Sequence, residues 1–325
     1  MQNFSQILSY ITEKEKDILN FKDSPQKLYE PIEYILSLGG KKIRPALALM
    51  SFNLFSDNFD EVIYQALAIE MYHNFTLMHD DLMDKALLRR GKAVVHEKWD
   101  ANTAILSGDA MLVYAYQLIE KTPSCFLPDV LQLFSKTAME VFKGQQYDME
   151  FETRTDISNN DYLKMIRLKT AVLLACALKI GAVLGNANDE NATWLYDFGI
   201  NLGLAFQLKD DLLDVYGNSE KFGKNIGGDI LCNKKTFLLI SALENANEKQ
   251  KEELLNWMQL TTFDKEEKIN RFTSIYNETN ARLLCEQEID NYYIKAIEAL
   301  KHVSVADDKK QPLLSLTELL MQRES

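Results

Sequence analysis

His79-Asp80-Asp81-Leu82-Met83-Asp84 contains a DDxxD motif, and the same pattern returns later in the chain as Asp210-Asp211-Leu212-Leu213-Asp214. Each copy follows an apolar segment whose hydrophobic residues recur at helical spacing, so both copies are predicted to lie on helices. Residues four apart lie on one face of a helix, about one turn from each other. The first and last aspartates of each motif are therefore expected to point the same way.

Three carboxylates within two helical turns repel one another, and burying them is costly unless a positive charge lies among them. Hard oxygen ligands suit Mg²⁺, which keeps several waters and is usually completed by phosphate oxygens of a substrate. A single DDxxD motif is as often a solvated helix end. Two copies with similar aliphatic spacers, apolar lead-ins and nearby basic residues favour a magnesium site.

The composition is that of an ordinary globular protein with a large core: 325 residues, 46% hydrophobic and 26% charged. With 13 Gly, 6 Pro and no linker-like stretch, a single domain over residues 1–325 is predicted. The net charge of −12 argues against nucleic acid and anionic membrane surfaces as partners. A phosphorylated substrate is still compatible, because metal ions and a few placed cations can bind a polyanion locally.

The cysteines lie far apart without a CxxC pattern, and they are expected to be unpaired thiols in a reducing cytosol. They are Cys125, Cys176, Cys232 and Cys285. No signal peptide precedes the first predicted helix, and no apolar run reaches the roughly 18 residues that span a bilayer. We therefore expect a soluble, cytoplasmic protein with no membrane span.

Helical periodicity covers most of the chain, and no convincing run of alternating strand residues is present. Two central helices, at about 61–84 and 194–215, carry the DDxxD motifs. Other long helices are predicted at about 99–119, 127–151 and 162–184, followed by amphipathic helices without catalytic spacing. The predicted architecture is an all-α, single-domain bundle whose two central helices face their aspartates across a cavity.

Basic residues flank the first motif on both sides. Gly39-Gly40-Lys41-Lys42-Ile43-Arg44-Pro45 places three cations at a glycine turn that opens a helix, where backbone N–H groups and the helix dipole favour an anion. Leu87-Leu88-Arg89-Arg90-Gly91-Lys92 brings three more, either as a solvated loop or as a second grip on the same phosphate. His73 lies two turns before Asp80. Its side chain is either part of the core or directed toward the ions that the aspartates bind.

The second half of the chain has polar residues in segments that should be core. Gly144-Gln145-Gln146-Tyr147-Asp148 interrupts one apolar stripe, and Lys169-Thr170 lies in a helix that is apolar almost all round. A buried lysine needs an anionic partner, so Asp148 and a bound phosphate are the candidates. The glycine-rich segment 217–228, with Lys221 and Lys224, is interpreted as a lid, and Asn233-Lys234-Lys235-Thr236 follows it.

Together these motifs resemble those of the trans-isoprenyl diphosphate synthases, or polyprenyl synthetases, of the short-chain farnesyl or geranylgeranyl type. The resemblance covers about residues 39–236 and rests on the two DDxxD motifs, GGKKIRP, RRG, KT, FQ and the late lysines. It implies a helical bundle of the isoprenoid synthase type and a prenyltransferase reaction. An allylic diphosphate (dimethylallyl, geranyl or farnesyl) ionises with help from Mg²⁺, isopentenyl diphosphate attacks the cation, and a proton is lost.

The resemblance also implies roles for individual residues. Direct metal ligands would be Asp80, Asp84 and Asp210, and supporting residues would be Asp81, Asp211 and Asp214. About three Mg²⁺ ions are implied, for which Mn²⁺ can substitute. The allylic diphosphate would be held by Arg89, Lys169, Lys224 and Lys234, and isopentenyl diphosphate by Lys41, Arg44, His73 and Arg90. The cation would be faced by Thr170 and Gln207, in a chamber also lined by Gln145 and Asp148. A homodimer is expected from the same resemblance.

Product length is predicted from the helix that precedes the first motif. Phe75 and Tyr72 lie five and eight residues before Asp80, which places them about 7.5 and 12 Å below it along the helix. In the resembled family an aromatic residue at the first of these positions limits growth, and Thr76 leaves space beside it. The expected products are therefore all-trans prenyl diphosphates of C15 to C20. If Phe75 merely packs the core, this expectation falls and the reaction class does not.

Three alternatives share the predicted fold: a longer-chain polyprenyl diphosphate synthase, a terpene cyclase or head-to-head condensing enzyme, and a non-catalytic subunit. A cyclase usually has a different second motif, and a non-catalytic subunit is expected to lose part of the acidic set, whereas all six aspartates are present. Two small departures from the family pattern are Lys42, where an arginine is common, and Asn233, where a glycine often precedes the late lysine.

Overall fold

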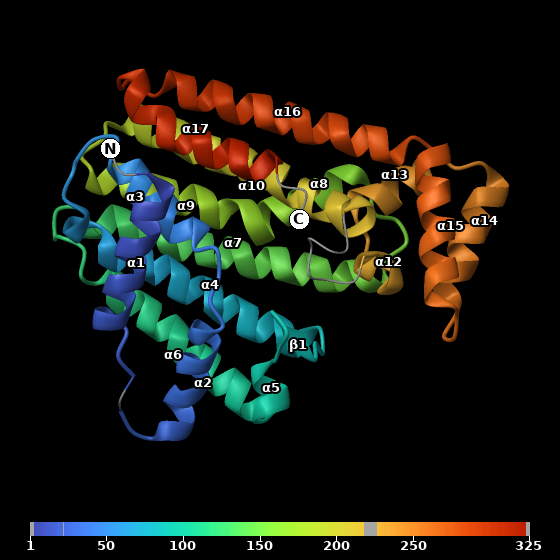
Figure 1. The fold of residues 1–325 in the computed structure, drawn as a ribbon, viewed down its shortest axis with the longest axis horizontal. Helices are drawn as coiled ribbons and strands as arrows, with labels where there is room; N and C mark the ends of the chain where they lie inside the picture. The colour runs from blue at the N-terminus through green and yellow to red at the C-terminus, as the bar shows by residue number, and fades with distance from the viewer. Residues whose placement is uncertain (1–2, 22, 218–225, 323–325) are drawn as a thin grey trace. The chain divides into compact units, whose positions relative to one another are not determined.

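The computed structural model describes residues 3–21, 23–217 and 226–322 (Figure 1). The architecture is all-α, as predicted, and the strands in the described part of the chain are limited to one two-residue pair. The chain divides into two compact units, which are described separately. The first contains Met1–Ser135, Cys176–Thr193 and Val305–Leu313, and the second contains Lys136–Ala175, Trp194–Ser304 and Leu314–Ser325. The single domain and the facing of the two motifs stay predictions.

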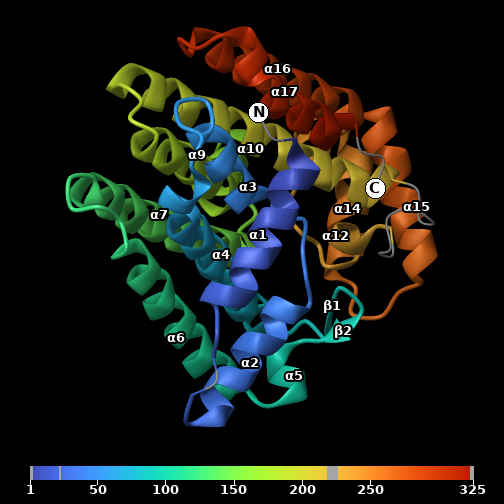
Figure 2. The same ribbon diagram turned by 60° about the vertical axis from the view of Figure 1, so that its left-hand side comes forward.

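The first unit is built around the helix that carries the first DDxxD motif. Its elements are α1 (Phe4–Ile18), α2 (Gln26–Ser37), α3 (Ile43–Phe52), η1 (Phe59–Glu61), α4 (Ile63–Met83), β1 (Leu88–Arg89), β2 (Lys92–Ala93), α5 (Val95–Lys98) and α6 (Ala101–Ile119). Helix α4 is buried on most of its surface and packs along α6 and against α3 (Figure 2). Gly108 of α6 lies directly against the His79 ring, and a Cβ at this position would collide with that ring. The missing side chain thus lets α6 approach the motif end of α4.

The second unit carries the second motif. Its elements, some of which begin or end in the first unit, are α7 (Leu127–Thr153), α8 (Asn159–Ile166), η2 (Arg167–Ala171), α9 (Val172–Leu184), α10 (Asp189–Tyr216), α12 (Gly228–Leu231), α13 (Phe237–Asn245), α14 (Glu248–Gln259), α15 (Lys265–Glu278), α16 (Ala281–His302) and α17 (Asp307–Gln322). Helix α13 packs against α15 and α16, around a core that includes Leu238, Phe272 and Cys285. Figure 1 shows α14 and α15 side by side.

The predicted helix at 162–184 is not continuous. Ser158 and Asp161 form a capping box that begins α8 at Asn159, and a π-helical turn, η2, then separates α8 from α9. Helical spacing in the sequence does not reveal a π turn, because the apolar pattern continues through it. Such turns are frequent at functional sites, and this one contains Lys169 and Thr170.

Two local structures were not predicted. The segment after the first motif is not an open loop: β1 and β2 pair as a hairpin whose turn, Arg90-Gly91, has φ of 52° and 74°, which suits a two-residue type I′ connection. Helix α2 has Pro25 as its N-cap and Gln26 as its first helical residue. The predicted lid falls largely on residues 218–225, so Lys221 and Lys224 lie outside the described residues.

Candidate active site

The first acidic motif occupies the last turn of α4, where Asp84 is the C-cap. Asp81 is buried, and its two carboxylate oxygens accept hydrogen bonds from Nε and Nη2 of Arg89 at 2.7 and 2.8 Å. This bidentate pair is a strong, geometrically specific contact, and it fixes the β1–β2 hairpin to the motif. Asp80 is half-buried and Asp84 is exposed.

A half-buried basic cluster lies in the same unit. Arg44 Nη1 and His73 Nε2 are 3.0 Å apart, and Arg44 Nε is buried without a hydrogen-bond partner in the part of the chain that the structure describes. Burial and the charges of Arg44, Arg89 and Arg90 hold the pKa of His73 well below its usual value, so the ring is neutral. Burial also lowers the pKa of Arg44 to about 10, although the Glu70 carboxylate opposes this shift.

The glycine turn lies against Arg90 of the β1–β2 hairpin. A Cβ on Gly40 would lie only 3.0 to 3.3 Å from the Arg90 guanidinium, so the turn and the hairpin are in close contact. Lys42 is instead ion-paired with Glu15 of α1 and begins α3 with a left-handed φ of 47°. Of the three cations predicted at this turn, Lys42 is therefore held by the protein, while Lys41 is exposed and Arg44 lies in the cluster.

The second acidic motif lies near the end of α10. Asp211 is buried and accepts hydrogen bonds from the Tyr162 hydroxyl and from Gln207 Nε2, the latter at 3.1 Å. Burial, followed by the negative charge of Asp229, raises the pKa of Asp211 to about 7, although Lys234 acts in the opposite direction. Asp214 Oδ2 accepts the backbone N–H of Asp229 at 2.9 Å.

The π turn supplies two polar side chains beside this motif. Lys169 is partly buried, and its Nζ lies 2.6 Å from Oδ2 of Asp148, one of its two candidate partners. Thr170 Oγ1 donates to Gln207 Oε1 at 3.1 Å, and Gln207 in turn donates to Asp211. A hydrogen-bonded chain thus joins η2 to the second motif. Gln145, another predicted residue, is partly buried on α7.

Lys234 lies in the turn between α12 and α13. Its Nζ is 3.7 Å from Asp229 Oδ1, and its backbone N–H donates to the Asp229 carbonyl at 2.9 Å. Asp229 and Tyr162 therefore contact the second motif. Neither was predicted from the sequence. Asp229 follows two glycines and Tyr162 follows a helix cap, but neither local pattern indicates a contact with a distant motif.

The residues predicted to set product length form part of an aromatic column in the first unit. The Phe75 ring lies 5.5 Å from Tyr72, which lies 5.5 Å from Phe134, and Phe134 lies 5.1 Å from Tyr116, as centroid distances. Phe75 and Tyr72 are both buried. The Thr76 hydroxyl donates to the His73 carbonyl at 2.8 Å, so its polar group is satisfied within α4.

The grouping of acidic side chains bears on the predicted metal site. Among residues 3–21, 23–217 and 226–322, no three His, Cys, Asp or Glu side chains are grouped so that they could hold a metal ion. The contacts of Asp81 and Asp211 give a reason, because these carboxylates are bound by Arg89 and by Tyr162 with Gln207. The remaining carboxylates fit Mg²⁺ as a donor set, since this ion takes one or two carboxylates and completes its shell with water and phosphate oxygens.

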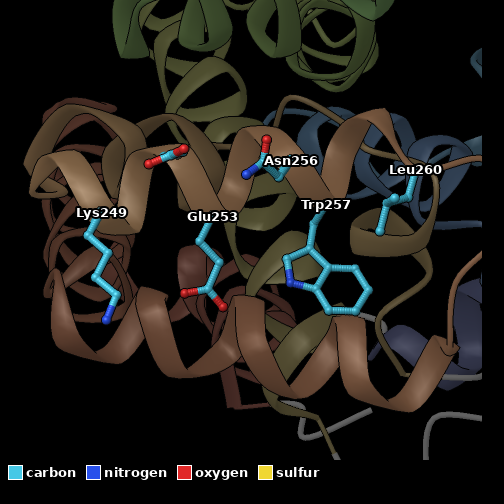
Figure 3. Close-up of a pocket in the computed structure, with 6 residues that line it drawn as sticks. Lys249, Glu253, Asn256, Trp257 and Leu260 are labelled. Carbon is cyan, nitrogen blue, oxygen red and sulfur yellow. The ribbon is translucent and has the colours of Figure 1, made fainter.

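A groove on the outside of α14 lies apart from all the predicted residues. It is lined by Lys249, Glu252, Glu253, Asn256, Trp257 and Leu260 (Figure 3). Glu253 forms a bidentate pair with Arg271 of α15, at 2.6 and 2.8 Å. Its charged residues, Lys249, Glu252 and Glu253, belong to neither DDxxD motif and were not predicted to bind substrate, so we do not associate the groove with the reaction.

The chain is similar in sequence and structure to proteins of known family. Residues 25–276 match the Polyprenyl synthetase family. A geranylgeranyl diphosphate synthase of Sulfolobus acidocaldarius is 36% identical over 94% of this chain and 92% of its own. The crystal structure of a geranylgeranyl pyrophosphate synthase has a TM-score of 0.94 and 41% identity, with 100% of both chains covered. That of a synthetase of the same name from Pyrococcus horikoshii has a TM-score of 0.91 and 31% identity over 98% of both chains.

The class defined by the fold and these matches is that of the short-chain trans-prenyltransferases, and the chain is an enzyme of this class. It belongs to the polyprenyl synthetase family. The reaction class predicted from the sequence is thereby confirmed, and the cyclase and non-catalytic alternatives are not favoured. Within the described residues, no helix is both long and apolar enough to cross a membrane.

Proposed function

We propose that this enzyme makes geranylgeranyl diphosphate, by adding isopentenyl diphosphate to an allylic diphosphate. The observation that carries the proposal is the pair of intact DDxxD motifs. Two relatives that match 94% and 98% of this chain are named geranylgeranyl diphosphate synthases. The buried aromatic Phe75, one turn before the first motif, supports a short product. Farnesyl diphosphate is the other product within the predicted range.

Six aspartates are proposed to bind Mg²⁺, with different roles. Direct ligands would be Asp80, Asp84 and Asp210, and supporting residues would be Asp81, Asp211 and Asp214. The supporting role suits Asp81 and Asp211, because both are buried and hydrogen-bonded to other side chains. Bound Mg²⁺ would supply electrostatic stabilisation of the charge on the departing diphosphate, worth several kcal/mol.

The basic residues are proposed to bind the two diphosphates. The allylic diphosphate would be held by Arg89, Lys169 and Lys234, together with Lys224 outside the described residues. Lys169 would exchange its contact with Asp148 for phosphate oxygens. Thr170 and Gln207 would face the allylic cation with hydroxyl and amide dipoles. These neutral groups would stabilise the cation without placing a charged nucleophile beside it.

Isopentenyl diphosphate is proposed to bind the cluster of the first unit, through Lys41, Arg44, His73 and Arg90. Arg44 Nε is buried and has no hydrogen-bond partner among the described residues, which supports this assignment, because a buried guanidinium donor without an acceptor is costly and a phosphate oxygen would satisfy it. The neutral His73 adds no charge and holds Arg44 in place through their 3.0 Å contact.

A homodimer in the cytosol is proposed as the working form. Ile105, Leu106 and Val113 of α6 are 45%, 62% and 58% exposed, and Leu106 and Val113 lie seven residues apart on one face of the helix. Exposed apolar side chains gathered on one face are typical of an interaction surface. Within the described residues no disulfide joins the four cysteines, which supports a reducing compartment.

The test is a set of incubations with Mg²⁺, isopentenyl diphosphate and, in turn, dimethylallyl, geranyl or farnesyl diphosphate. We expect consumption of isopentenyl diphosphate with each primer and a C20 diphosphate as the principal product by mass spectrometry. Asp80→Asn and Asp210→Asn serve as inactive controls. A folded protein that consumes no isopentenyl diphosphate with any primer would contradict the reaction, and a C15 end product would contradict only the proposed chain length.

A further inference from the structure

Helix α15 contains a lysine that no part of the proposed reaction uses. The Lys268 side chain is fully buried, at 0% exposure, and its Nζ donates to Asn233 Oδ1 at 2.7 Å. The same ammonium lies 4.2 Å from the centroid of the Phe263 ring. Burial lowers the pKa of Lys268. Burying an ammonium group is costly unless it is hydrogen-bonded. The hydrogen bond from Lys268 to Asn233 is therefore expected to have a structural role.

The acceptor of this hydrogen bond is in an unusual backbone conformation. Asn233 has a φ of 55°, in the left-handed region that few residues other than Gly, Asn and Asp adopt readily. Its side chain is held at both ends, since Oδ1 accepts from Lys268 and Nδ2 donates to the Met258 carbonyl at 3.0 Å. The end of α14 and the first turn of α15 therefore fix this one residue.

The turn that contains Asn233 determines where Lys234 lies. The Asn233 N–H donates to the Ile230 carbonyl at 3.1 Å, and the next N–H, of Lys234, donates to the Asp229 carbonyl at 2.9 Å. The Asp229 N–H is itself bound by Asp214 of the second acidic motif. Two hydrogen bonds thus join Asp214 to Lys234 through Asp229, and the left-handed Asn233 is the residue directly before the lysine.

Helix α15 also supports the start of this path. A Cβ on Gly227, which has a φ of 81°, would lie 2.6 Å from the side chain of Ile269. Lys268 and Ile269 are consecutive, so neighbouring residues of α15 contact the segment before α12 and the turn after it. The contact with Gly227 is packing, whereas the contact with Asn233 is a directed hydrogen bond from a buried charge.

We propose that Lys268 is a positioning residue, which holds Asn233 in the left-handed turn and so places Lys234 to bind the allylic diphosphate. The inference rests on the proposed role of Lys234. It gives the hairpin of α14 and α15, for which the sequence indicates no chemistry, a part in substrate binding. Lys268 touches neither substrate nor metal in this scheme, and its effect is confined to the diphosphate that Lys234 contacts.

The decisive comparison uses Lys268→Met and Lys268→Gln. Methionine fills the buried space without a donor, and we expect it to raise the KM for the allylic diphosphate about tenfold, or about 1.4 kcal/mol, with little change in the KM for isopentenyl diphosphate. Glutamine keeps an N–H donor for Asn233 and should keep the wild-type KM. In Lys268→Met, adding Asn233→Gly should restore the KM, because glycine adopts a positive φ without side-chain support. Lys265→Met, at an exposed position of the same helix, is the control and should behave as wild type.

Lys234→Gln separates this inference from the proposed function. If Lys234→Gln leaves the allylic KM unchanged, the assignment of Lys234 is wrong. If it raises that KM while a folded Lys268→Met with wild-type Tm does not, or if Asn233→Gly fails to restore the KM, the positioning role is overturned. Should Lys268→Met not fold, Asn233→Ala and Asn233→Gly replace it: alanine should raise the allylic KM and glycine should not, and equal values in both would reject the proposal.

Discussion

At the scale of single residues, the two DDxxD motifs divide their carboxylates in the same way. The middle aspartate is buried and bound by protein donors in both motifs, Asp81 by Arg89 and Asp211 by Tyr162 and Gln207. The first aspartates, Asp80 and Asp210, are only partly buried. The middle position of each motif thus stabilises the local structure, and the direct metal ligands are proposed to be Asp80, Asp84 and Asp210.

This division predicts different effects for neighbouring substitutions. Asp80→Asn should lower kcat at least about 100-fold with little change in Tm, because it removes a proposed metal ligand. Asp81→Asn should instead destabilise the fold by about 2 kcal/mol, since it leaves the Arg89 guanidinium without its charged partner. Steady-state kinetics and urea unfolding of both variants check this. Equal loss of stability in the two would show that the roles are not divided in this way.

Phe75→Ala should lengthen the products beyond C20, because removing the ring opens space one turn below the first motif. The change should also cost about 3 kcal/mol of stability, as is usual for a buried phenylalanine. Phe52→Ala, at a fully buried site on α3, is the matched control: it should cost similar stability and leave the products unchanged. Chromatography of the prenyl alcohols gives the readout, and an unchanged profile in Phe75→Ala would contradict the chain-length assignment.

His73 gives a pH prediction. Its pKa in the folded protein is held well below about 6.5, so the unfolded chain binds a proton first as the pH falls. Stability is then lost below this pH, by up to about 1.4 kcal/mol per pH unit. Burial raises the pKa of Glu70, so this residue changes stability with pH in the opposite direction. Glu70 is present in both the wild type and His73→Gln. His73→Gln should therefore lose less stability than the wild type between pH 6.5 and 5 in urea titrations, and parallel curves would contradict a neutral, buried His73.

At the scale of elements, the sequence predicted the long helices well, because their apolar positions repeat over many turns. It did not predict the π turn, the β1–β2 hairpin or the left-handed turn at Asn233. Each of these spans only a few residues and is determined by a contact with a distant segment. The partners of Asp211 were missed for the same reason, since the Tyr162 hydroxyl comes from a different helix.

The π turn can be tested through the glycine that packs against it. A Cβ on Gly144 of α7 would collide with the backbone of Leu168 and Lys169, which cannot move as a flexible side chain can. Gly144→Ala should therefore displace η2 and its Lys169–Asp148 pair, and lower kcat/KM for the allylic substrate about tenfold or more. Lys143→Ala, the exposed neighbour, should be neutral. A wild-type kcat/KM in folded Gly144→Ala would show that the position of the turn is not critical.

At the scale of the whole molecule, the net charge of −12 and the proposed anionic substrates are compatible because the cations are local. Arg44, Arg89 and Arg90 lie close enough to depress the pKa of His73, and so form a concentrated positive site in an acidic protein. The remaining negative surface disfavours nonspecific binding of nucleic acid and anionic membranes.

The oligomeric state can be tested through the exposed apolar face of α6. If the exposed apolar face of α6 is the homodimer contact, the wild type should have a mass of twice 37.4 kDa by light scattering. Leu106→Glu, at a residue that is 62% exposed, should give a monomer, because burying an unpaired carboxylate in an apolar contact is costly. Leu319→Glu, at a comparably exposed leucine of α17, should stay dimeric. A monomeric wild type, or a dimeric Leu106→Glu, would place the apolar face of α6 outside any contact between two copies of the chain.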